Sequence, residues 1–479
     1  MPAMPARRLY PAALCAGLVL LAAAANAQSP PRRISTLDRA ARAELIDSLS
    51  AALLRTYVEA DTAAMIARRL RERQSAGAYD ALAEPAKFAE QVTTDLRSLN
   101  GDLHLSLRYD PEGATAGGPV MVRRSVPQPI AGAGGGSSAP GGAGSPLGSH
   151  GPAGPGSPVP RMFGMGDPRE QNFGLTRVEV LPGNVGLLEI TGFLEAPGME
   201  EALVAALRFI EHTDAVIIDL RRNRGGSGNM SHLTFSHFLG ATPVPTIHVK
   251  SRIPGMSRDQ TSVAEVPGPR RPDVPLYVLT SRSTGSAGEE FTFVLQNLKR
   301  ALVVGDRTAG AGHMVQGIQL PNGFAAGVSI TRVSQPGTGR EWEAVGVQPD
   351  VRVAPERALA TAHAAALRSL AKSADEAKRR TLEMAAEWVE ARDRNEAVPT
   401  SRLAALAGAY EGDRVVEVRD GRLRYRRGER VEELVALGGD RFSIGGEARL
   451  AFAAGSPAPS VTVERSDGTT AVYRRVSAD

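Results

Sequence analysis

The stretch LYVLTSRSTGSAGEEFTFVLQNL, residues 276–298, joins a short apolar run to a helix-like pattern through a turn of small residues. The run at 276–281 is typical of a buried strand. Apolar residues at three- and four-residue spacing follow the turn and predict a helix, and Glu289 and Glu290 suit the positive end of its macrodipole. Ser286 therefore falls at a strand-to-helix turn, where free backbone amides point outward.

Ser286 has two interpretations. It is a helix N-cap, the commoner outcome for a serine at this position when the stretch is taken alone. It is also placed as a nucleophile would be, with nearby amides able to stabilise an oxyanion. The rest of the chain has to decide between them.

Strand-like and helical patterns alternate around this stretch. Apolar strands flanking helices predict an α/β core with a mostly parallel sheet covered on both faces. Ligand sites in such sheets form at the carboxyl ends of the strands, and both RNRGGSGN (222–229) and the Ser286 turn fall there. The strands and the intervening helix are predicted at 175–193 (two strands around a Pro-Gly-Asn turn), 198–214 (helix), 215–221, 276–281 and 300–306.

Gly225 and Gly226 follow the predicted strand at 215–221. A glycine pair lets backbone amides approach a ligand closely, as an oxyanion hole requires, but it is equally common in tight turns. A phosphate cradle has little support, because no Walker lysine follows and the glycines do not form the dinucleotide fingerprint.

Four segments in this order and spacing together resemble a known family. The chain is similar to the tail-specific (C-terminal processing) serine peptidases, and most of all to the branch that includes the tricorn core protease and interphotoreceptor retinoid-binding protein. The resemblance covers about residues 36–110 and 173–355 and implies a ClpP/crotonase-like α/β core. The segments are DLRRNRGG (219–226), LTSRSTGSAGEEF (279–291), RALVVGDRTAGAG (300–312) and EWEAVGVQPDV (341–351).

The resemblance implies a nucleophile and an oxyanion hole. Ser286 matches the family nucleophile. The amide of Ala287, with that of Gly225 or Gly226, would bind the oxyanion.

The resemblance also implies the base. The processing peptidases activate their serine with a lysine, whose position here is Ala311, so a Ser-Lys dyad is not expected. The tricorn-like branch uses a histidine and a glutamate, which His104 and Glu343 match. Serine needs an adjacent base, and histidine titrates near neutrality. His313, in GAGHMV, is the alternative base.

One position departs from that branch. Tricorn-like sites have a serine directly before the histidine, whereas this chain has Leu103. Asp102 or Ser106 is the candidate for the missing polar link. His232 and His237, which follow the glycine turn, are interpreted as packing or surface residues.

The chain has 479 residues and a formal net charge of +4, without a dense basic run, so nucleic acid is not an expected partner. Arg7 and Arg8, an apolar run and Ala-Asn-Ala at 25–27 predict a cleaved secretory signal and an exported, periplasmic or secreted protein. Cys15, the single cysteine, lies inside that segment, so the mature chain would hold no disulfide.

The chain divides by composition and pattern. The Gly-, Pro- and Ser-rich insertion is expected to be flexible, and hairpin signals around Asp420-Gly421 and Asp467-Gly468 predict an antiparallel C-terminal domain. The predicted units are 1–27 (signal peptide), 33–110 (helical N-terminal bundle), 111–171 (insertion), 172–355 (α/β core), 356–398 (helices broken near residue 373) and 403–479 (small β domain).

These patterns predict a serine peptidase of Ser-His(-Glu) type that acts on peptides or unfolded proteins through an acyl-enzyme. The alternative is an inactive family member that binds apolar ligands or acts as an envelope scaffold. No cofactor is expected, and no spacing of histidines and carboxylates along the chain predicts a metal site. Nothing in the sequence indicates an oligomeric state.

Overall fold

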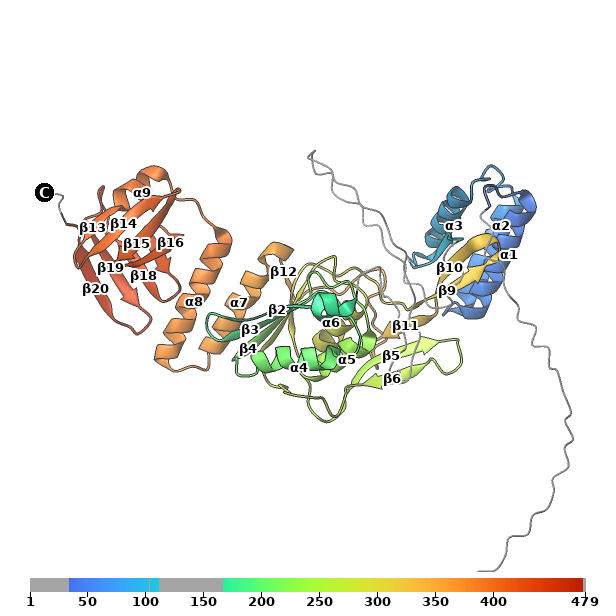
Figure 1. Ribbon diagram of the computed structural model, residues 1–479, viewed down its shortest axis with the longest axis horizontal. Helices are drawn as coiled ribbons and strands as arrows, with labels where there is room; N and C mark the ends of the chain where they lie inside the picture. Colours follow the sequence, from blue (N-terminus) through green and yellow to red (C-terminus); the bar gives the residue numbers. More distant parts are fainter. Residues whose placement is uncertain (1–33, 103, 112–166, 477–479) are drawn as a thin grey trace, which may run out of the picture.

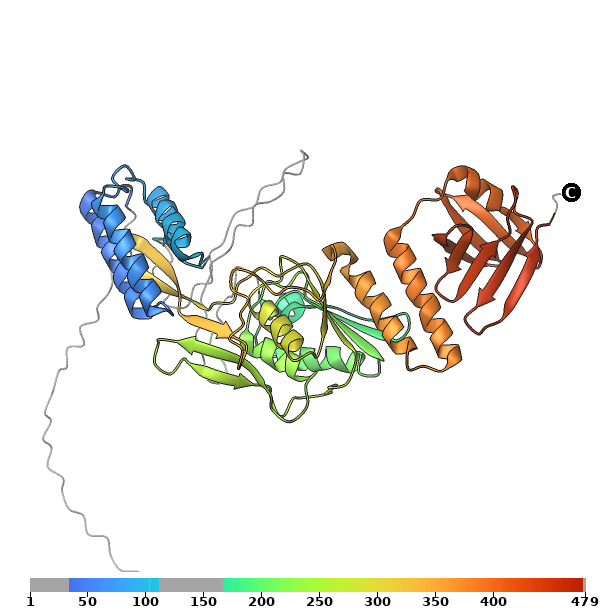
Figure 2. The same ribbon diagram turned by 180° about the vertical axis from the view of Figure 1, so that it is seen from behind.

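The computed structural model describes residues 34–102, 104–111 and 167–476. The predicted signal at 1–27, most of the insertion and Leu103 lie outside these residues. Three units follow one another along the long axis, with a helical unit at one end, an α/β unit in the middle and an antiparallel β unit at the other (Figure 1; Figure 2 shows the same order from behind). No helix within the described ranges is long and apolar enough to cross a membrane.

The helical unit contains α1 (Arg39–Thr56), α2 (Ala60–Ser75) and α3 (Pro85–Asn100). The Asp38 side chain accepts a hydrogen bond from the Ala41 amide and caps α1. Gly101 ends α3 in the left-handed conformation, at φ 74°. The short strand β1 (Ser106–Tyr109) follows directly.

A hairpin from far along the chain completes the helical unit. Strand β1 pairs antiparallel with β10 (Phe324–Ser329), which pairs in turn with β9 (Val315–Leu320) across η3 (Pro321–Gly323). Phe324 is fully buried and meets Phe88 of α3 edge to face, with ring centroids 6.1 Å apart. The three helices lie within the segment at 33–110 for which a helical bundle is predicted, but this hairpin was not anticipated from the sequence.

The α/β unit is built on a six-stranded sheet in the order β12-β8-β7-β4-β3-β2. All neighbours are parallel except β2 and β3, so the predicted mixed α/β architecture with a mostly parallel sheet is confirmed. The strands are β2 (Leu175–Leu181), β3 (Val185–Ile190), β4 (Ala215–Asp219), β7 (Leu276–Thr280), β8 (Leu302–Gly305) and β12 (Val351–Arg352).

Helices cover both faces of this sheet, which explains why β4 and β7 are buried throughout and apolar except at their last residues. Side chains such as Ile218 and Val278 pack against α4 (Met199–Phe209), α5 (Gly228–Ser236) and α6 (Ala287–Asn297). Their neighbours Ile217 and Leu279 point to the other face and pack against the helical hairpin of α7 (Pro355–Ala371) and α8 (Glu376–Arg394). The break between these two helices falls at the predicted position.

A small antiparallel sheet in the order β11-β5-β6 lies between the helical and α/β units (Figure 1). Its strands are β5 (Pro245–Ser251), β6 (Arg258–Thr261) and β11 (Thr331–Ser334), and a 3₁₀ segment, η2 (Pro168–Gly174), precedes β2.

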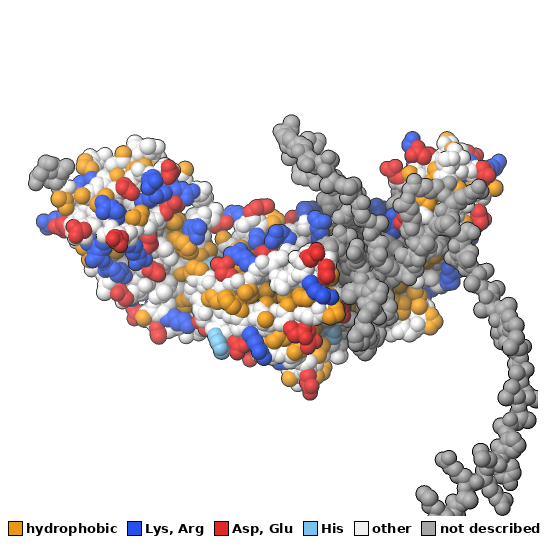
Figure 3. Space-filling model, viewed as in Figure 1, with side chains coloured by type: hydrophobic (Ala, Val, Ile, Leu, Met, Phe, Trp, Pro, Cys, Tyr) orange, Lys and Arg blue, Asp and Glu red, His pale blue; other side chains and the backbone are white. Residues whose placement is uncertain are grey.

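The C-terminal unit is an eight-stranded antiparallel meander that follows α9 (Thr400–Leu406). Both predicted hairpins are present, β14-β15 and β19-β20. The first and last strands approach each other through a bridge between Tyr410 and Arg475, so the sheet nearly closes into a barrel. Acidic and basic side chains are interspersed over its visible surface (Figure 3). The strands are β13 (Gly408–Tyr410), β14 (Arg414–Arg419), β15 (Arg422–Arg427), β16 (Arg430–Gly438), β17 (Arg441–Ile444), β18 (Ala448–Phe452), β19 (Ser460–Arg465) and β20 (Thr470–Arg474).

We expect Phe324→Ala to lower the stability of the helical unit by about 3–5 kcal/mol, because it leaves a cavity under β10. Native-state hydrogen exchange of the amides in α1 and α3 measures this change. The control is Phe209→Ala, whose side chain is 59% exposed and whose removal should change stability by less than about 0.5 kcal/mol. Unchanged protection in the Phe324 variant would contradict the packing of the hairpin on the helices.

Candidate active site

Ser286 is the N-cap of α6, directly after the loop that leaves β7. Its backbone has φ 52° and ψ −119°, a combination that a residue with a side chain rarely adopts and that costs of order 1–3 kcal/mol. Such strain persists where surrounding contacts impose it, and it gathers at functional sites. The cap and the nucleophile interpretations of Ser286 are therefore compatible.

The buried carboxylate of Glu289 supplies those contacts. It accepts hydrogen bonds from the amides of Ser286 (2.9 Å), Gly310 (2.6 Å) and Ala311 (2.7 Å) and from the Thr308 hydroxyl (2.5 Å). Burial raises the pKa of Glu289, and these four donors oppose that shift. Sequence reasoning assigned Glu289 only to the helix macrodipole. The Ser-x-x-Glu spacing, which is that of a capping box, was the available signal.

The glycine turn after β4 lies against the Ser286 turn. A Cβ on Gly225 would come within 2.7 Å of Ser286 Cβ, so this position tolerates no side chain without movement. Asn223 holds the turn, since its side-chain amide donates to the Ile190 carbonyl (3.1 Å) and its backbone carbonyl accepts from the Gly285 amide (3.0 Å).

The candidate oxyanion amides differ in whether they already donate a hydrogen bond within the protein. The Gly225 amide already donates to Asn223 Oδ1 (2.8 Å). Among the hydrogen bonds of the described residues, none uses the amide of Gly226 or of Ala287. Ala287 is the first residue of α6, where an amide has no intrahelical acceptor. The structure thus leaves Gly226 and Ala287 as the available donors.

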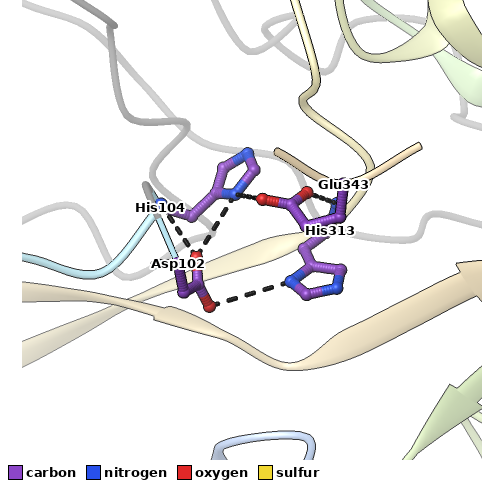
Figure 4. Close-up of side chains that lie close together, drawn as sticks. All are labelled: Asp102, His104, His313 and Glu343. Carbon is purple, nitrogen blue, oxygen red and sulfur yellow. Dashed lines mark hydrogen bonds and ion pairs between the residues drawn. The ribbon is translucent and has the colours of Figure 1, made fainter. Parts of the chain in front are cut away.

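His104 lies where the helical unit meets the α/β unit (Figure 4). Its Nδ1 is 2.9 Å from Glu343 Oε1 and 3.5 Å from Asp102 Oδ1, and its other ring nitrogen points away from both carboxylates. The Asp102 carboxylate also accepts the His104 backbone amide (2.9 Å). Asp102 therefore supplies the polar contact that Leu103 does not, and the sequence-predicted partners His104 and Glu343 lie together.

The charges of this cluster determine how His104 titrates. Burial lowers the pKa of His104, but its contacts with Asp102 and Glu343 outweigh burial and raise that pKa to about 9. The two histidines hold the pKa of Asp102 well below its usual range against the opposing effect of burial. Tyr57 donates to Asp102 Oδ2 (3.1 Å), and burial and the Asp102 charge raise the pKa of Tyr57.

Hydrogen bonds connect the His104 cluster to the Ser286 turn. The second oxygen of Glu343 accepts from the amides of Gly312 (2.7 Å) and His313 (2.9 Å). The preceding residue, Ala311, donates its amide to Glu289, which also holds the Ser286 amide. Ala311 thus occupies the middle of this chain of contacts.

The three other histidines considered from the sequence differ in whether they lie near His104. His313 joins the cluster, with Nδ1 3.7 Å from Asp102 Oδ2 and its ring centroid 6.1 Å from that of His104. His232 contacts the Thr261 carbonyl (2.7 Å) and His237 the Pro269 carbonyl (2.8 Å), and both contacts are structural.

Comparison with known proteins agrees with this arrangement. Residues 184–353 match the model of peptidase family S41. Over these residues the chain is similar to peptidase family S41. The resemblance inferred from the sequence is thereby confirmed.

The curated relatives match parts of the chain. The chloroplastic C-terminal processing peptidase of Tetradesmus obliquus is 38% identical over 82 residues, 17% of this chain and 18% of that protein. The carboxyl-terminal-processing protease of Synechocystis is 29% identical over 171 residues, 35% of this chain and 38% of that protein. The chain thus spans well under half the length of the relatives that it matches.

Solved structures with a similar arrangement are distant. The photosystem II D1 C-terminal processing protease shares 24% identity, with a TM-score of 0.31 over 36% of this chain and 43% of that one. A lipoprotein from Streptococcus agalactiae shares 13% identity, with a TM-score of 0.40 over 68% of this chain and 95% of that one.

We expect Glu289→Gln to destabilise the Ser286 turn by at least about 2 kcal/mol, because the new amide group faces donors where an acceptor is needed. Faster hydrogen exchange of the backbone amides at 283–290 and 308–313 would reveal this destabilisation. The matched control is Glu290→Gln on the next residue. Burial raises the pKa of Glu290 to about 7, so a neutral side chain is tolerated there and exchange should change little. Equal exchange in the two variants would contradict the role of Glu289.

Proposed function

We propose that this protein is a serine peptidase that hydrolyses peptide bonds through an acyl-enzyme, with Ser286 as nucleophile and His104 as base. The observation that carries the proposal is a series of contacts that joins the strained Ser286 turn to His104. Glu289 accepts the amides of Ser286 and Ala311, and Glu343 accepts the amide of the next residue, Gly312, and contacts His104. The match of residues 184–353 to peptidase family S41 supports the same chemistry.

The mechanism follows from the chemistry of these groups. His104 takes the proton of Ser286 as its oxygen attacks the substrate carbonyl, using the ring nitrogen that points away from the carboxylates. Glu343 and Asp102 stabilise the resulting imidazolium. The amides of Gly226 and Ala287 bind the oxyanion, His104 returns the proton to the leaving amine, and water then resolves the acyl-enzyme.

This mechanism is of Ser-His-Glu type, without a catalytic lysine. Ala311 stands at the position of the processing peptidases' lysine, and its amide binds Glu289. The proposal includes a ClpP/crotonase-like core, the unit boundaries given by the sequence, and export through the segment at 1–27. The substrates are peptides or unfolded proteins, in keeping with the C-terminal processing named for the relatives.

We expect Ser286→Ala to lose labelling by a serine-directed fluorophosphonate and at least about 10³-fold of peptide hydrolysis, because the nucleophile is gone. Ser283→Ala is the matched control, since Ser283 is an exposed serine of the same turn and should keep both properties. Mass spectrometry of the products from a mixture of unfolded proteins identifies the cleaved bonds. Peptide hydrolysis by the Ser286 variant at the rate of the parent chain would disprove the proposal.

We expect the labelling rate of Ser286 to rise about tenfold per pH unit from pH 7 toward 9, because only neutral His104 accepts a proton and its pKa is about 9. Asp102→Asn removes one of the facing carboxylates and should move the midpoint of this profile to lower pH. The rates are measured with EDTA present and corrected for hydrolysis of the probe. A flat profile, or a midpoint that moves upward in the variant, would contradict the assignment of His104 as base.

A further inference from the structure

The four side chains around His104 have the composition of a metal site. One ligand atom from each of Asp102, His104, His313 and Glu343 can be chosen so that all four lie within 4.8 Å of one another. His104 Nδ1 lies 2.9 Å from Glu343 and 3.5 Å from one oxygen of Asp102, whose other oxygen lies 3.7 Å from His313. In a tetrahedral site with bonds of about 2.0 Å the ligand atoms lie about 3.3 Å apart, so these separations bracket the spacing needed.

Several buried atoms of this cluster have no hydrogen bond of good geometry among the described residues. They are Nδ1 of His104, both ring nitrogens of His313 and Oε1 of Glu343, although His104 Nδ1 and Glu343 Oε1 lie 2.9 Å from each other. The Glu343 side chain is 10% exposed and that of Asp102 4%. A buried polar atom without a well-oriented partner is unfavourable, and a cation at the centre of the cluster would give these atoms a partner.

The rest of the protein orients these ligands. The Gly312 and His313 amides hold one oxygen of Glu343 and leave Oε1 facing the cluster. Tyr57 donates to Asp102 and accepts a hydrogen bond from Asn100 (2.7 Å). Such outer contacts pre-position metal ligands.

We propose that Asp102, His104, His313 and Glu343 bind one divalent transition-metal ion of the Zn²⁺ class. Two imidazoles with two carboxylates suit zinc and its neighbours, whereas Mg²⁺ and Ca²⁺ prefer all-oxygen sites. The two carboxylates also balance the charge of a divalent ion. The ligands lie as far apart as residues 102 and 343, which is why no spacing along the chain predicts the site.

The consequence for activity rests on the proposed function. The His104 nitrogen that faces the cluster is Nδ1, so a bound ion forces the proton of the neutral ring onto Nε2. A protonated Nε2 cannot take the Ser286 proton, and Glu343 is withdrawn to the metal. The ion therefore inhibits the peptidase instead of supporting it.

Direct binding tests the site without reference to activity. Zn²⁺ alone is titrated by calorimetry into the full-length chain after dialysis against EDTA and then against chelator-free buffer. We expect one ion per chain, a loss of affinity of at least about tenfold in His313→Ala, His313→Gln and Glu343→Gln, and no response to Mg²⁺. Circular dichroism verifies that each variant is folded, and His313→Gln serves if His313→Ala is not.

The matched control is His248→Ala. His248 is an exposed histidine whose Nδ1 lies 2.7 Å from Asp259, so it offers a surface His-carboxylate pair of the same chemistry. It should bind Zn²⁺ as the parent does. Parent-like binding by the folded His313 and Glu343 variants, or no binding by the parent, would overturn the proposed site.

Fluorophosphonate labelling tests the inhibition separately. We expect one equivalent of Zn²⁺ to abolish labelling of the parent chain and EDTA to restore it, while Ser286→Ala binds Zn²⁺ with unchanged affinity. Undiminished labelling at saturating Zn²⁺ would refute the inhibitory role. A metal-free parent that is never labelled would instead refute the proposed function, and calorimetry would still decide the metal site.

Discussion

The active-site region depends on one buried carboxylate, that of Glu289. Removing a carboxylate from water is costly unless hydrogen bonds replace those of the solvent. Three backbone amides and the Thr308 hydroxyl do so here, and Thr308 in turn accepts the Val347 amide (2.6 Å). Because the donors come from two loops, the Glu289 carboxylate ties the Ser286 turn to the loop at 308–311, and Thr308 links that loop to the segment near Val347.

The site is divided between two structural units. The α/β unit supplies Ser286 and Glu343, and the end of the helical unit supplies Asp102 and His104. The β9-β10 hairpin leaves the α/β unit, pairs with β1 and buries Phe324 among the helices. That pairing keeps the histidine near the glutamate. The packing of this hairpin therefore controls where His104 lies relative to Glu343.

Under the proposed mechanism and the proposed metal site, the His104 imidazole acts as base or binds the ion, and it cannot do both at once. The proposed mechanism needs Nδ1 protonated against Glu343 and Nε2 free to accept a proton. Metal binding takes Nδ1 and reverses the tautomer. A proton and a metal cation compete for Nδ1 of His104, and the buried carboxylates of Asp102 and Glu343 attract both.

Local pattern predicted much of the fold. Period-two and period-3.6 hydrophobicity gave the strands of the parallel sheet, the helices and the two C-terminal hairpins, because these elements depend mostly on which neighbouring side chains are buried. The hairpin at 315–329 was missed, since its strands pair with β1 more than 200 residues away. Glu289 was seen as a first-turn carboxylate, and its hydrogen-bond partners beyond the turn were not foreseen.

The sequence by itself determined the residue types of the candidate site, the resemblance to the processing peptidases, and the absence of a lysine at position 311. Those properties are carried by short segments and their order along the chain. Tertiary structure alone decided that Asp102 rather than Ser106 contacts His104, that the Gly225 amide is occupied, and that His313 joins the cluster. The physical reason is that hydrogen-bond partners and charge separations are set by distances in space, and those distances arise where distant segments pack together.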